Sequence, residues 1–300
     1  MQSSDDPTRV GVPGAMPKCP SACRPGLLVA FSICLLFAFL VTPADSQAQT
    51  PSPLASWQYS AGEVLVKLGD DPLPEWRVTL GLTGTVMPKY EGADSYEVMP
   101  GGIVDIRFRD IAFFSVGEGL GVNLLRGDTY RAGVAVSYDL GRNDNDDPRI
   151  RGLGDIDPAP EAKLFGQVFI LPVVLSFDVR RGIGGHDGWI GDLSAYMPLS
   201  ASKKFIAFAG PSVTLADQDY MDSYFSVSPG QAANSRLPAF KADPGIKNAN
   251  FGVTAIYFIT DNWLIVADAA VEQLLGDAAR SPITQSRTQF TFDLSIAYAF

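Results

Sequence analysis

Residues 290–300 alternate between large apolar side chains and polar or small ones, and the chain ends on Phe300. Successive side chains of a β-strand point to opposite faces, so this period of two predicts a strand with one apolar face. The same alternation occurs in residues 75–86, 96–108 and 130–140, where most apolar residues take even positions. The sequence is therefore predicted to fold as an all-β protein.

Weaker strand patterns fill much of the remaining chain. They cover residues 111–125, 161–179, 188–198, 203–215, 220–228, 249–259 and 262–273, with turn-rich or charged stretches between them. Runs of about ten alternating residues separated by turns are typical of transmembrane β-barrels, and bacterial single-chain barrels have even strand numbers. Since the clear and weak patterns together make about eleven strands, we expect an antiparallel barrel of about 12, with roughly 10 as the alternative.

One uncharged apolar run, residues 27–41, stands near the N-terminus. At about 15 residues it is shorter than the roughly 20 that a membrane-spanning helix needs, and it suits the apolar region of a secretory signal peptide. Basic residues precede the run, and the small residues Ser46 and Ala48 follow it at cleavage-site spacing. We predict a signal peptide over residues 1–48, with Met16 as an alternative start. The alternative interpretation is an uncleaved anchor helix.

The predicted mature chain is acidic and contains no cysteine. The leader holds three acidic and three basic residues, so the net charge of the whole sequence, −10, is also that of the remainder. Such a chain lacks the basic surface that binds nucleic acid. All three cysteines lie in the leader, which excludes disulfides, thiolate ligands and cysteine nucleophiles. Proline-rich residues 49–74 are predicted to form a periplasmic lead-in before a barrel over residues 75–300.

Alternation alone would also fit a soluble β-sandwich, because both folds have strands with one polar face. Aromatic residues near the strand ends favour the barrel, since they form girdles at the membrane interfaces. These residues are Trp76, Tyr90, Tyr96, Tyr130, Tyr138, Trp189, Trp263 and Tyr298. The final strand, with Tyr298 and Phe300, also resembles the assembly signal of bacterial outer-membrane barrels. We therefore expect a protein of a Gram-negative-type cell outer membrane, in contact with its lipid and lipopolysaccharide.

Charged residues on the polar faces of the predicted strands are expected to point into the lumen. They are Arg77, Glu97, Asp105, Arg107, Arg131, Asp139 and Asp293. A barrel of about 12 strands has a small lumen. Mixed charges on its wall can act as a selectivity filter or pair into a plug, and the sequence leaves both open. On the opposite faces, Leu294 and Ile296 are expected to contact lipid.

The single histidine, His186, lies in the segment Gly184-Gly-His-Asp-Gly188. One hypothesis makes it a general base oriented by Asp187. A base must reach its nucleophile, however, and no G-x-S-x-G elbow occurs. The alternative is a turn whose glycines supply positive φ angles, and we favour it. With one histidine and no mature cysteine, we expect no catalytic residue, no metal site and no cofactor.

Two further segments imitate ligand-binding loops. Residues 142–147 are acidic but lack the glycine and glutamate of an EF-hand loop, so we expect a solvated loop, with cation bridging to lipopolysaccharide as the alternative. Residues 116–121 are rich in glycine, but no helix follows as in a phosphate-binding loop. Small residues at a bend of the barrel explain them better.

A series of short motifs resembles the MipA/OmpV family. They are Pro88-Lys-Tyr-Glu-Gly92, Gly152-Leu-Gly-Asp155, Gly184-Gly-His-Asp-Gly188, Gly210-Pro-Ser212, Ala216-Asp217 with Tyr220, Tyr224-Phe225, Gln231-Ala232 with Ser235, Leu237 and Pro238, Leu274-Leu-Gly-Asp-Ala-Ala279 and Ser281-Pro-Ile283. The resemblance covers roughly residues 74–300 in order and spacing. Ala93 and Arg280 depart from it, because the family often has Asp or Ser there.

This resemblance implies an outer-membrane barrel that is not an enzyme. It also implies two roles described for different family members. One is a scaffold that links a murein transglycosylase with a murein synthase, and we prefer this function. The other is a narrow porin or solute channel. Because a fold does not fix a function, the resemblance does not choose between them.

Overall fold

The computed structural model describes residues 75–300, except residues 171 and 203. Its strands form one closed antiparallel barrel in which β1 pairs with both β2 and β12. The strands are β1 (Trp76–Pro88), β2 (Tyr96–Phe108), β3 (Ala112–Ser115), β4 (Gly119–Arg126), β5 (Tyr130–Asp139), β6 (Ala159–Ile170), β7 (Val173–Gly182), β8 (Trp189–Ala201), β9 (Phe205–Ala216), β10 (Gly245–Phe258), β11 (Trp263–Leu274) and β12 (Thr288–Ala299). The predicted 12-stranded barrel is confirmed. The predictions for residues 1–48 and 49–74 lie outside the described residues.

The strand number agrees with the prediction, but three segments were interpreted wrongly. Residues 111–125 form two strands, because Gly119 turns the chain between β3 and β4 with a φ of +85°. Residues 161–179 also form two strands, β6 and β7; Pro172, at their junction, cannot donate a ladder hydrogen bond. Residues 220–228 form no strand, because most of them belong to a helix or its end. Because two candidate segments each form two strands and a third forms none, the eleven candidates become twelve strands.

That helix is α3 (Gln218–Tyr224). The Asp217 side chain accepts a hydrogen bond from the Tyr220 backbone N–H and caps the helix start. Tyr220, Met221 and Tyr224 are buried on one face, which is the spacing of a helix rather than of a strand. Two other helices, α4 (Pro229–Asn234) and α5 (Gly276–Arg280), also lie in connections between strands.

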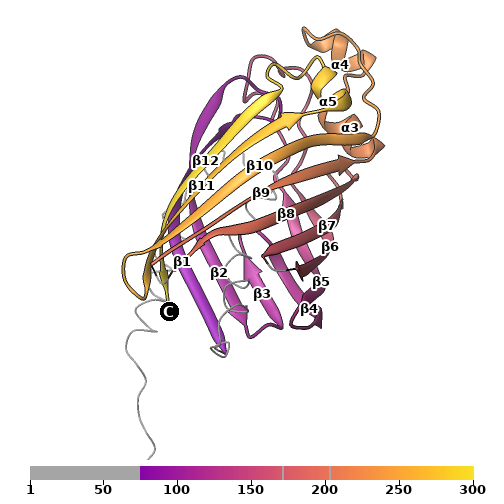
Figure 1. Cartoon of the computed structure of the whole chain (residues 1–300). Helices are drawn as coiled ribbons and strands as arrows, with labels where there is room; N and C mark the ends of the chain where they lie inside the picture. The colour runs from indigo at the N-terminus through magenta and orange to yellow at the C-terminus, as the bar shows by residue number, and fades with distance from the viewer. Residues whose placement is uncertain (1–74, 171, 203) are drawn as a thin grey trace, which may run out of the picture. The chain divides into compact units, whose positions relative to one another are not determined.

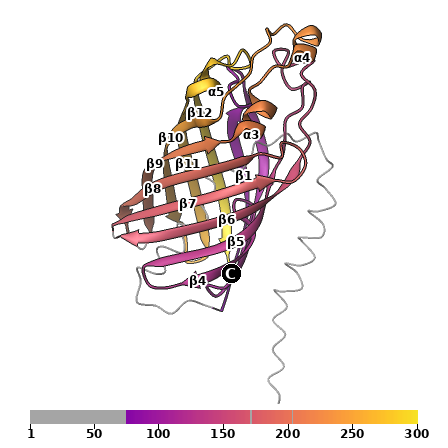
Figure 2. The same ribbon diagram turned by 90° about the vertical axis from the view of Figure 1, so that its right-hand side faces the viewer.

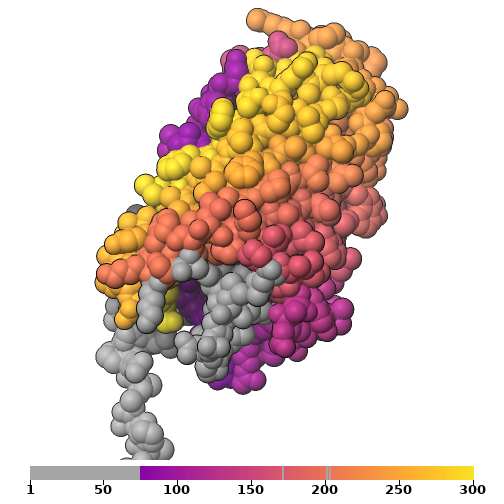
Figure 3. Space-filling model, viewed as in Figure 1, coloured from indigo at the N-terminus to yellow at the C-terminus, as the bar shows by residue number. Residues whose placement is uncertain are grey.

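The two ends of the barrel differ in their connections. The helices α3, α4 and α5 of the described residues lie at the end opposite the C-terminus (Figures 1 and 2). In the space-filling view, the segments coloured orange to yellow run along one face of the barrel and reach this end (Figure 3). In outer-membrane barrels the long loops are extracellular and the short turns periplasmic. We call the helix-bearing end the outer end and the opposite end the inner end. No helix in the described part of the chain is long and apolar enough to cross a membrane.

The outer wall of the barrel is apolar. Leu294 is 52 % exposed and Ile296 is also exposed, whereas Ser295 between them is 3 % exposed. In a closed barrel the covered side chain of each alternating pair faces the lumen, so the even positions of β12 face outward. Most of the aromatic residues predicted to form girdles are likewise exposed, but Tyr90 is not. Tyr90 is buried beneath the outer loops, and its hydroxyl donates to the Ile283 carbonyl over 3.2 Å.

Apolar side chains also occupy part of the lumen, which the polar-face pattern did not predict. A buried cluster, here called the apolar plug, consists of Phe169, Val174, Tyr196, Ile206, Phe208, Ile256 and Val266. Most of its members lie near the inner-end limits of β6, β7, β9, β10 and β11. A second cluster under α3 and α5 includes Met221, Phe225 and Ala278. The lumen therefore carries apolar packing toward each end.

Candidate functional site

The lumen charges predicted from the sequence lie on the covered face of their strands, and several form one cluster. Arg107 donates to Asp105 over 2.9 Å and makes a short ion pair with Glu118. Arg131 lies 3.9 Å from Glu118 and donates to Gln167 over 2.9 Å. We call these five residues the Arg107 cluster. Arg107 and Arg131 are both almost fully buried, so the cluster stands inside the barrel rather than in bulk water.

Glu118 was not among the predicted residues, although the sequence singled out its segment. The glycines on either side of it belong to the turn between β3 and β4. Its backbone N–H donates to the Ser115 hydroxyl over 3.0 Å, which holds the turn against the wall. The segment that imitated a phosphate-binding loop therefore delivers a carboxylate to two buried guanidinium groups.

The other predicted lumen charges have different surroundings. Asp293 accepts hydrogen bonds from the hydroxyls of Thr83, Thr85 and Ser295. Asp139 lies at the outer end of β5. Arg77 and Glu97 are half-buried near opposite ends of β1 and β2. The structure therefore does not bring the predicted charges into a single site.

A second buried cluster, the Arg180 cluster, was missed by sequence reasoning. The guanidinium of Arg180 makes a short ion pair with Asp192, lies 3.0 Å from Asp178 and lies 3.8 Å from Glu161. Lys163 lies 3.8 Å from Asp178. Residues with odd numbers point inward in β6, whereas residues with even numbers point inward in β7. Treating residues 161–179 as one strand hid this change, and the proline at position 172 was the signal that could have revealed it.

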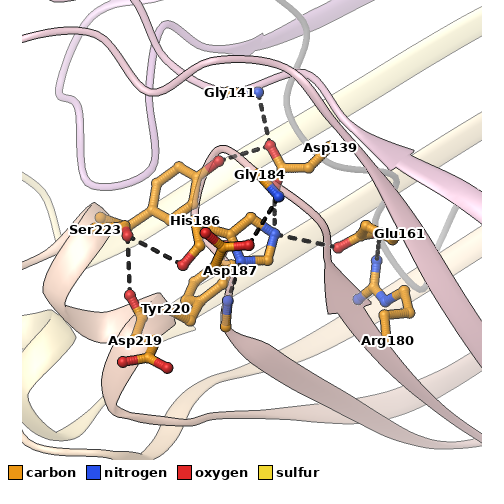
Figure 4. Close-up of polar contacts among 12 residues, drawn as sticks. Asp139, Gly141, Glu161, Arg180, Gly184, His186, Asp187, Asp219, Tyr220 and Ser223 are labelled. Atoms are coloured by element: carbon orange, nitrogen blue, oxygen red, sulfur yellow. Dashed lines mark hydrogen bonds and ion pairs between the residues drawn. The ribbon is translucent and has the colours of Figure 1, made fainter.

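His186 lies in the predicted turn, between β7 and β8, where Gly184 and Gly185 have positive φ angles. The Asp187 carboxylate accepts a hydrogen bond from the Gly184 N–H over 2.8 Å (Figure 4). The His186 Nε2 atom faces Asp139 and Glu161, 3.5 Å from each. Both carboxylates are distant in sequence and are brought to the histidine by the barrel.

The helix α3 covers this histidine. Tyr220 packs its ring against the imidazole edge to face, with centroids 5.1 Å apart. The Tyr224 hydroxyl donates to Asp139 over 2.6 Å. Burial, helped by Tyr220 and Asp139, raises the pKa of the Tyr224 phenol, so this hydroxyl stays protonated and remains a donor. The acidic Asp139 is thereby fixed in one orientation.

The geometry around His186 does not assemble a serine–histidine pair. The nearby Ser223 hydroxyl donates to the backbone carbonyls of His186 and Asp219, over 3.4 and 2.9 Å, and not to the imidazole (Figure 4). A general base must lie within hydrogen-bond reach of the group that it activates. Within the described residues, the arrangement suits binding or structural support better than nucleophilic catalysis.

The acidic loop at residues 142–147 uses its carboxylates to hold its own backbone. Asp144 accepts from the N–H groups of Gly152 and Gly154, both over 3.0 Å. Asp147 accepts from the Ser95 hydroxyl over 2.8 Å, which ties the loop to the connection before β2. These bonds give two carboxylates of the loop a role in holding the neighbouring connections.

Comparison with known proteins agrees with the barrel. A family model described as "MltA-interacting protein MipA" matches residues 80–300. Outer membrane protein OmpV of Vibrio cholerae is 34 % identical over 95 residues, which are 32 % of this chain and 35 % of OmpV. Outer membrane protein Omp26La of Vibrio anguillarum is 32 % identical over an alignment of the same length and coverage. The alignments thus span about a third of these relatives.

Two porins are among the solved structures to which the chain is similar. The KdgM porin has a TM-score of 0.41 at 8 % identity, covering 74 % of this chain and 99 % of the porin. The NanC porin has a TM-score of 0.43 at 7 % identity, covering 73 % and 98 %. Likeness at this level does not extend to function.

Proposed function

The chain belongs to the MipA family of outer-membrane proteins, and from this premise we propose that it is a non-conducting barrel that binds murein enzymes. In this role its inner end holds a murein transglycosylase and a murein synthase near one another. Outer-membrane lipid covers the apolar wall, and lipopolysaccharide lies beside the outer loops. The barrel itself performs no catalysis.

The observation that supports this proposal is the packing of charged and apolar side chains inside the barrel. On the side of β2 to β6, the Arg107 cluster places buried ion pairs along the inner part of the wall. On the side of β6 to β11, the apolar plug packs buried side chains near the inner end. Ions cross an apolar constriction poorly because it dewets, and paired charges resist separation in a confined space. A barrel closed in this way acts through its surface rather than through its channel.

A narrow solute channel is the second candidate, and one region favours it. Asp268 and Asp293 lie opposite one another in the register of β11 and β12. Hydroxyl groups donate to both carboxylates: Thr254 to Asp268, and the β1 threonines Thr83 and Thr85 to Asp293. A wall lined by carboxylates and hydroxyls is suited to the passage of cations or polyols. This side of the lumen could therefore serve as a path if the apolar plug moved.

The test combines partner capture with conductance on the same purified protein. The mature chain, with and without residues 49–74, is used to capture a murein transglycosylase and a murein synthase. Bilayer conductance is measured in parallel. We expect capture without solute-selective conductance, and weaker capture when residues 49–74 are deleted.

A lumen variant supplies the matched control. Arg107→Ala combined with Glu118→Ala removes the buried pair while leaving the inner-end turns unchanged. This variant should conduct more than the parent and capture the same enzymes. Selective conductance of the parent protein with no captured enzyme would overturn the scaffold and favour the channel.

A further inference from the structure

Three potential metal ligands from three separate segments converge beneath α3. Asp139 ends β5, Glu161 lies near the start of β6, and His186 comes from the turn between β7 and β8. One ligand atom from each lies within 4.8 Å of the other two. His186 is 3 % exposed and Glu161 is 0 % exposed, so the three groups meet in a space that bulk water does not reach.

Two of these groups are buried without a hydrogen-bond partner. In the described part of the chain, His186 Nε2 and both carboxylate oxygens of Glu161 make no hydrogen bond. The distances of 3.5 Å from His186 Nε2 to Asp139 Oδ2 and to Glu161 Oε1 exceed ordinary hydrogen-bond lengths. Leaving such groups unsatisfied costs about 1–3 kcal/mol each, and more when they are charged. A ligand that contacts both groups is therefore expected between them.

The spacing suits a tetrahedral metal ion. Zinc binds histidine nitrogen and carboxylate oxygen at about 2.0–2.2 Å, which places neighbouring ligands of a tetrahedron about 3.3–3.6 Å apart. Both measured separations from His186 Nε2, 3.5 Å, fall in this interval. A nitrogen donor beside two oxygens favours zinc and similar transition metals over calcium or magnesium, which prefer oxygen alone.

The surroundings already orient Asp139 and make room for the imidazole. The Tyr224 hydroxyl and the Gly141 N–H both donate to Asp139 Oδ1, each over 2.6 Å, and Oδ2 lies 3.5 Å from His186 Nε2. Such outer contacts usually accompany metal ligands. Gly182 makes room for the imidazole, because a Cβ there would lie 2.6 Å from the ring. The position of His186 therefore depends on both the turn and the adjoining strand.

The local charge also favours a cation. Arg180 Nη1 lies 3.8 Å from Glu161 Oε2, but the same guanidinium also faces Asp178 and Asp192. Glu161 therefore shares this arginine with two other carboxylates. A divalent ion beside Glu161 would add positive charge to this group of acidic side chains.

From these observations we propose that Asp139, Glu161 and His186 bind a divalent transition-metal ion, zinc in preference, with water as the fourth ligand. The site would fasten β5, β6 and the turn after β7 together at the outer end. It goes beyond the proposed function and does not depend on it. It also opposes the prediction, made from the sequence, that the chain has no metal site; that prediction could not anticipate the convergence of Asp139 and Glu161.

Binding changes the protonation of His186. In the structure Nδ1 accepts a hydrogen bond from the Gly188 N–H over 3.0 Å, so the proton of the neutral ring is on Nε2. A metal at Nε2 displaces that proton, and the neutral ligand carries its proton on Nδ1 instead. The Gly188 contact must then open. Because His186 is the single histidine of the chain, its ring nitrogens report this change without overlap.

The experiment uses the untagged full-length mature protein, purified in detergent and treated with a chelator. Zinc chloride is added, free metal is removed, and bound zinc is measured by elemental analysis. The ¹⁵N chemical shifts of the labelled histidine are recorded with and without zinc. We expect a single zinc ion per chain and a shift of the Nε2 resonance typical of metal ligation. Wild-type protein that retains no zinc, or whose histidine resonances do not move, would overturn the proposal.

Variants separate this site from adventitious binding. His186→Gln and Glu161→Gln should each lose at least tenfold in zinc affinity, as metal-site changes of this kind do. Asp187→Asn is the matched control, because that carboxylate is next in sequence but bonds to Gly184, and it should bind zinc like the wild type. Equal binding by all four proteins would contradict the site. Electrophoretic mobility with and without heating verifies folding; if a variant does not fold, the wild-type histidine spectrum decides.

Discussion

The carboxylates inside the barrel are stabilised in two different ways on its two sides. On the side of β2 to β6, Glu118 and Asp105 contact the guanidinium of Arg107. On the side of β1, β11 and β12, Asp293 is held by hydroxyl groups. Both arrangements satisfy buried oxygens, but only the first balances their charge. Removing a partner should therefore lower the free energy of unfolding much more on the first side than on the second.

This difference follows from what remains after a partner is removed. Without its guanidinium, a buried carboxylate keeps a full charge in a confined space. A hydroxyl donor is one of several, and its loss leaves other donors in place. Two sides with similar burial can thus differ in how much each depends on any single residue. The following predictions test that difference.

The largest effect is expected for Arg107→Met. Removing this cation leaves Glu118 and Asp105 close together without the guanidinium that they share, with Arg131 3.9 Å from Glu118. Breaking one half of a buried ion pair costs about 3–5 kcal/mol. Urea unfolding in detergent micelles measures the loss. Adding Glu118→Gln to Arg107→Met should recover part of the lost stability. If Arg107→Met alone were as stable as the parent protein, the ion pair would not be buried in solution.

The next effect compares the two faces of β12. Leu294→Arg places a cation on the apolar outer wall, which costs roughly 2–4 kcal/mol near the membrane midplane. Ser295→Arg points inward, next to Asp293, whose carboxylate contacts the Ser295 hydroxyl over 2.6 Å. It should cost less, because it converts the hydroxyl-bonded side into an ion-paired one. Unfolding in lipid vesicles measures both variants. The opposite order would mean that the face of Leu294 lines the lumen.

A smaller effect is expected for Asp293→Asn. The asparagine carbonyl still accepts from at least one of Thr83, Thr85 and Ser295, and no guanidinium loses its partner among the contacts described for Asp293. The loss should be about 0.5–1.5 kcal/mol, the value of an ordinary hydrogen bond. The same urea titration measures it. A loss as large as that of Arg107→Met would remove the distinction between the two sides.

The sequence predicted the outer wall better than the lumen. Alternation placed Leu294, Ile296 and the inward charges on opposite faces of their strands, since a period of two follows from strand geometry alone. It could not pair Arg107 with Glu118, because their contact depends on the turn at Gly119. The assembly role of Tyr298 and Phe300 stays a prediction; in the structure their rings pack 4.8 Å apart.

The outer end was the least predictable part. Helix α3 was interpreted as a strand because its aromatic residues also occur in strands, and only the Asp217 cap and the helical spacing distinguish the two. The convergence at His186 joins residues up to 47 positions apart, and no local pattern records such a contact. The period of two in the sequence indicates which side chains of one strand share a face. Contacts between the loops and turns that join the strands form only when the barrel closes.

The smallest effect is expected where an ion pair lies at the surface. Asp277 pairs with Arg280 in α5; the Arg280 side chain is 68 % exposed, whereas that of Asp277 is 8 % exposed, so water reaches the pair from the arginine side. A hydrogen bond from the Asp243 N–H, together with Arg280, lowers the pKa of Asp277. A carboxyl group with a lowered folded pKa stabilises the protein above its unfolded pKa, near 3.9, and loses that contribution as the pH falls through the folded value. Asp277→Asn should therefore cost about 0–1 kcal/mol at pH 7 and progressively less below about pH 4. Urea titrations of both proteins across this range measure the difference. A loss at pH 7 that rivals Arg107→Met, or one that persists in acid, would show that exposure to water does not separate this pair from the buried one.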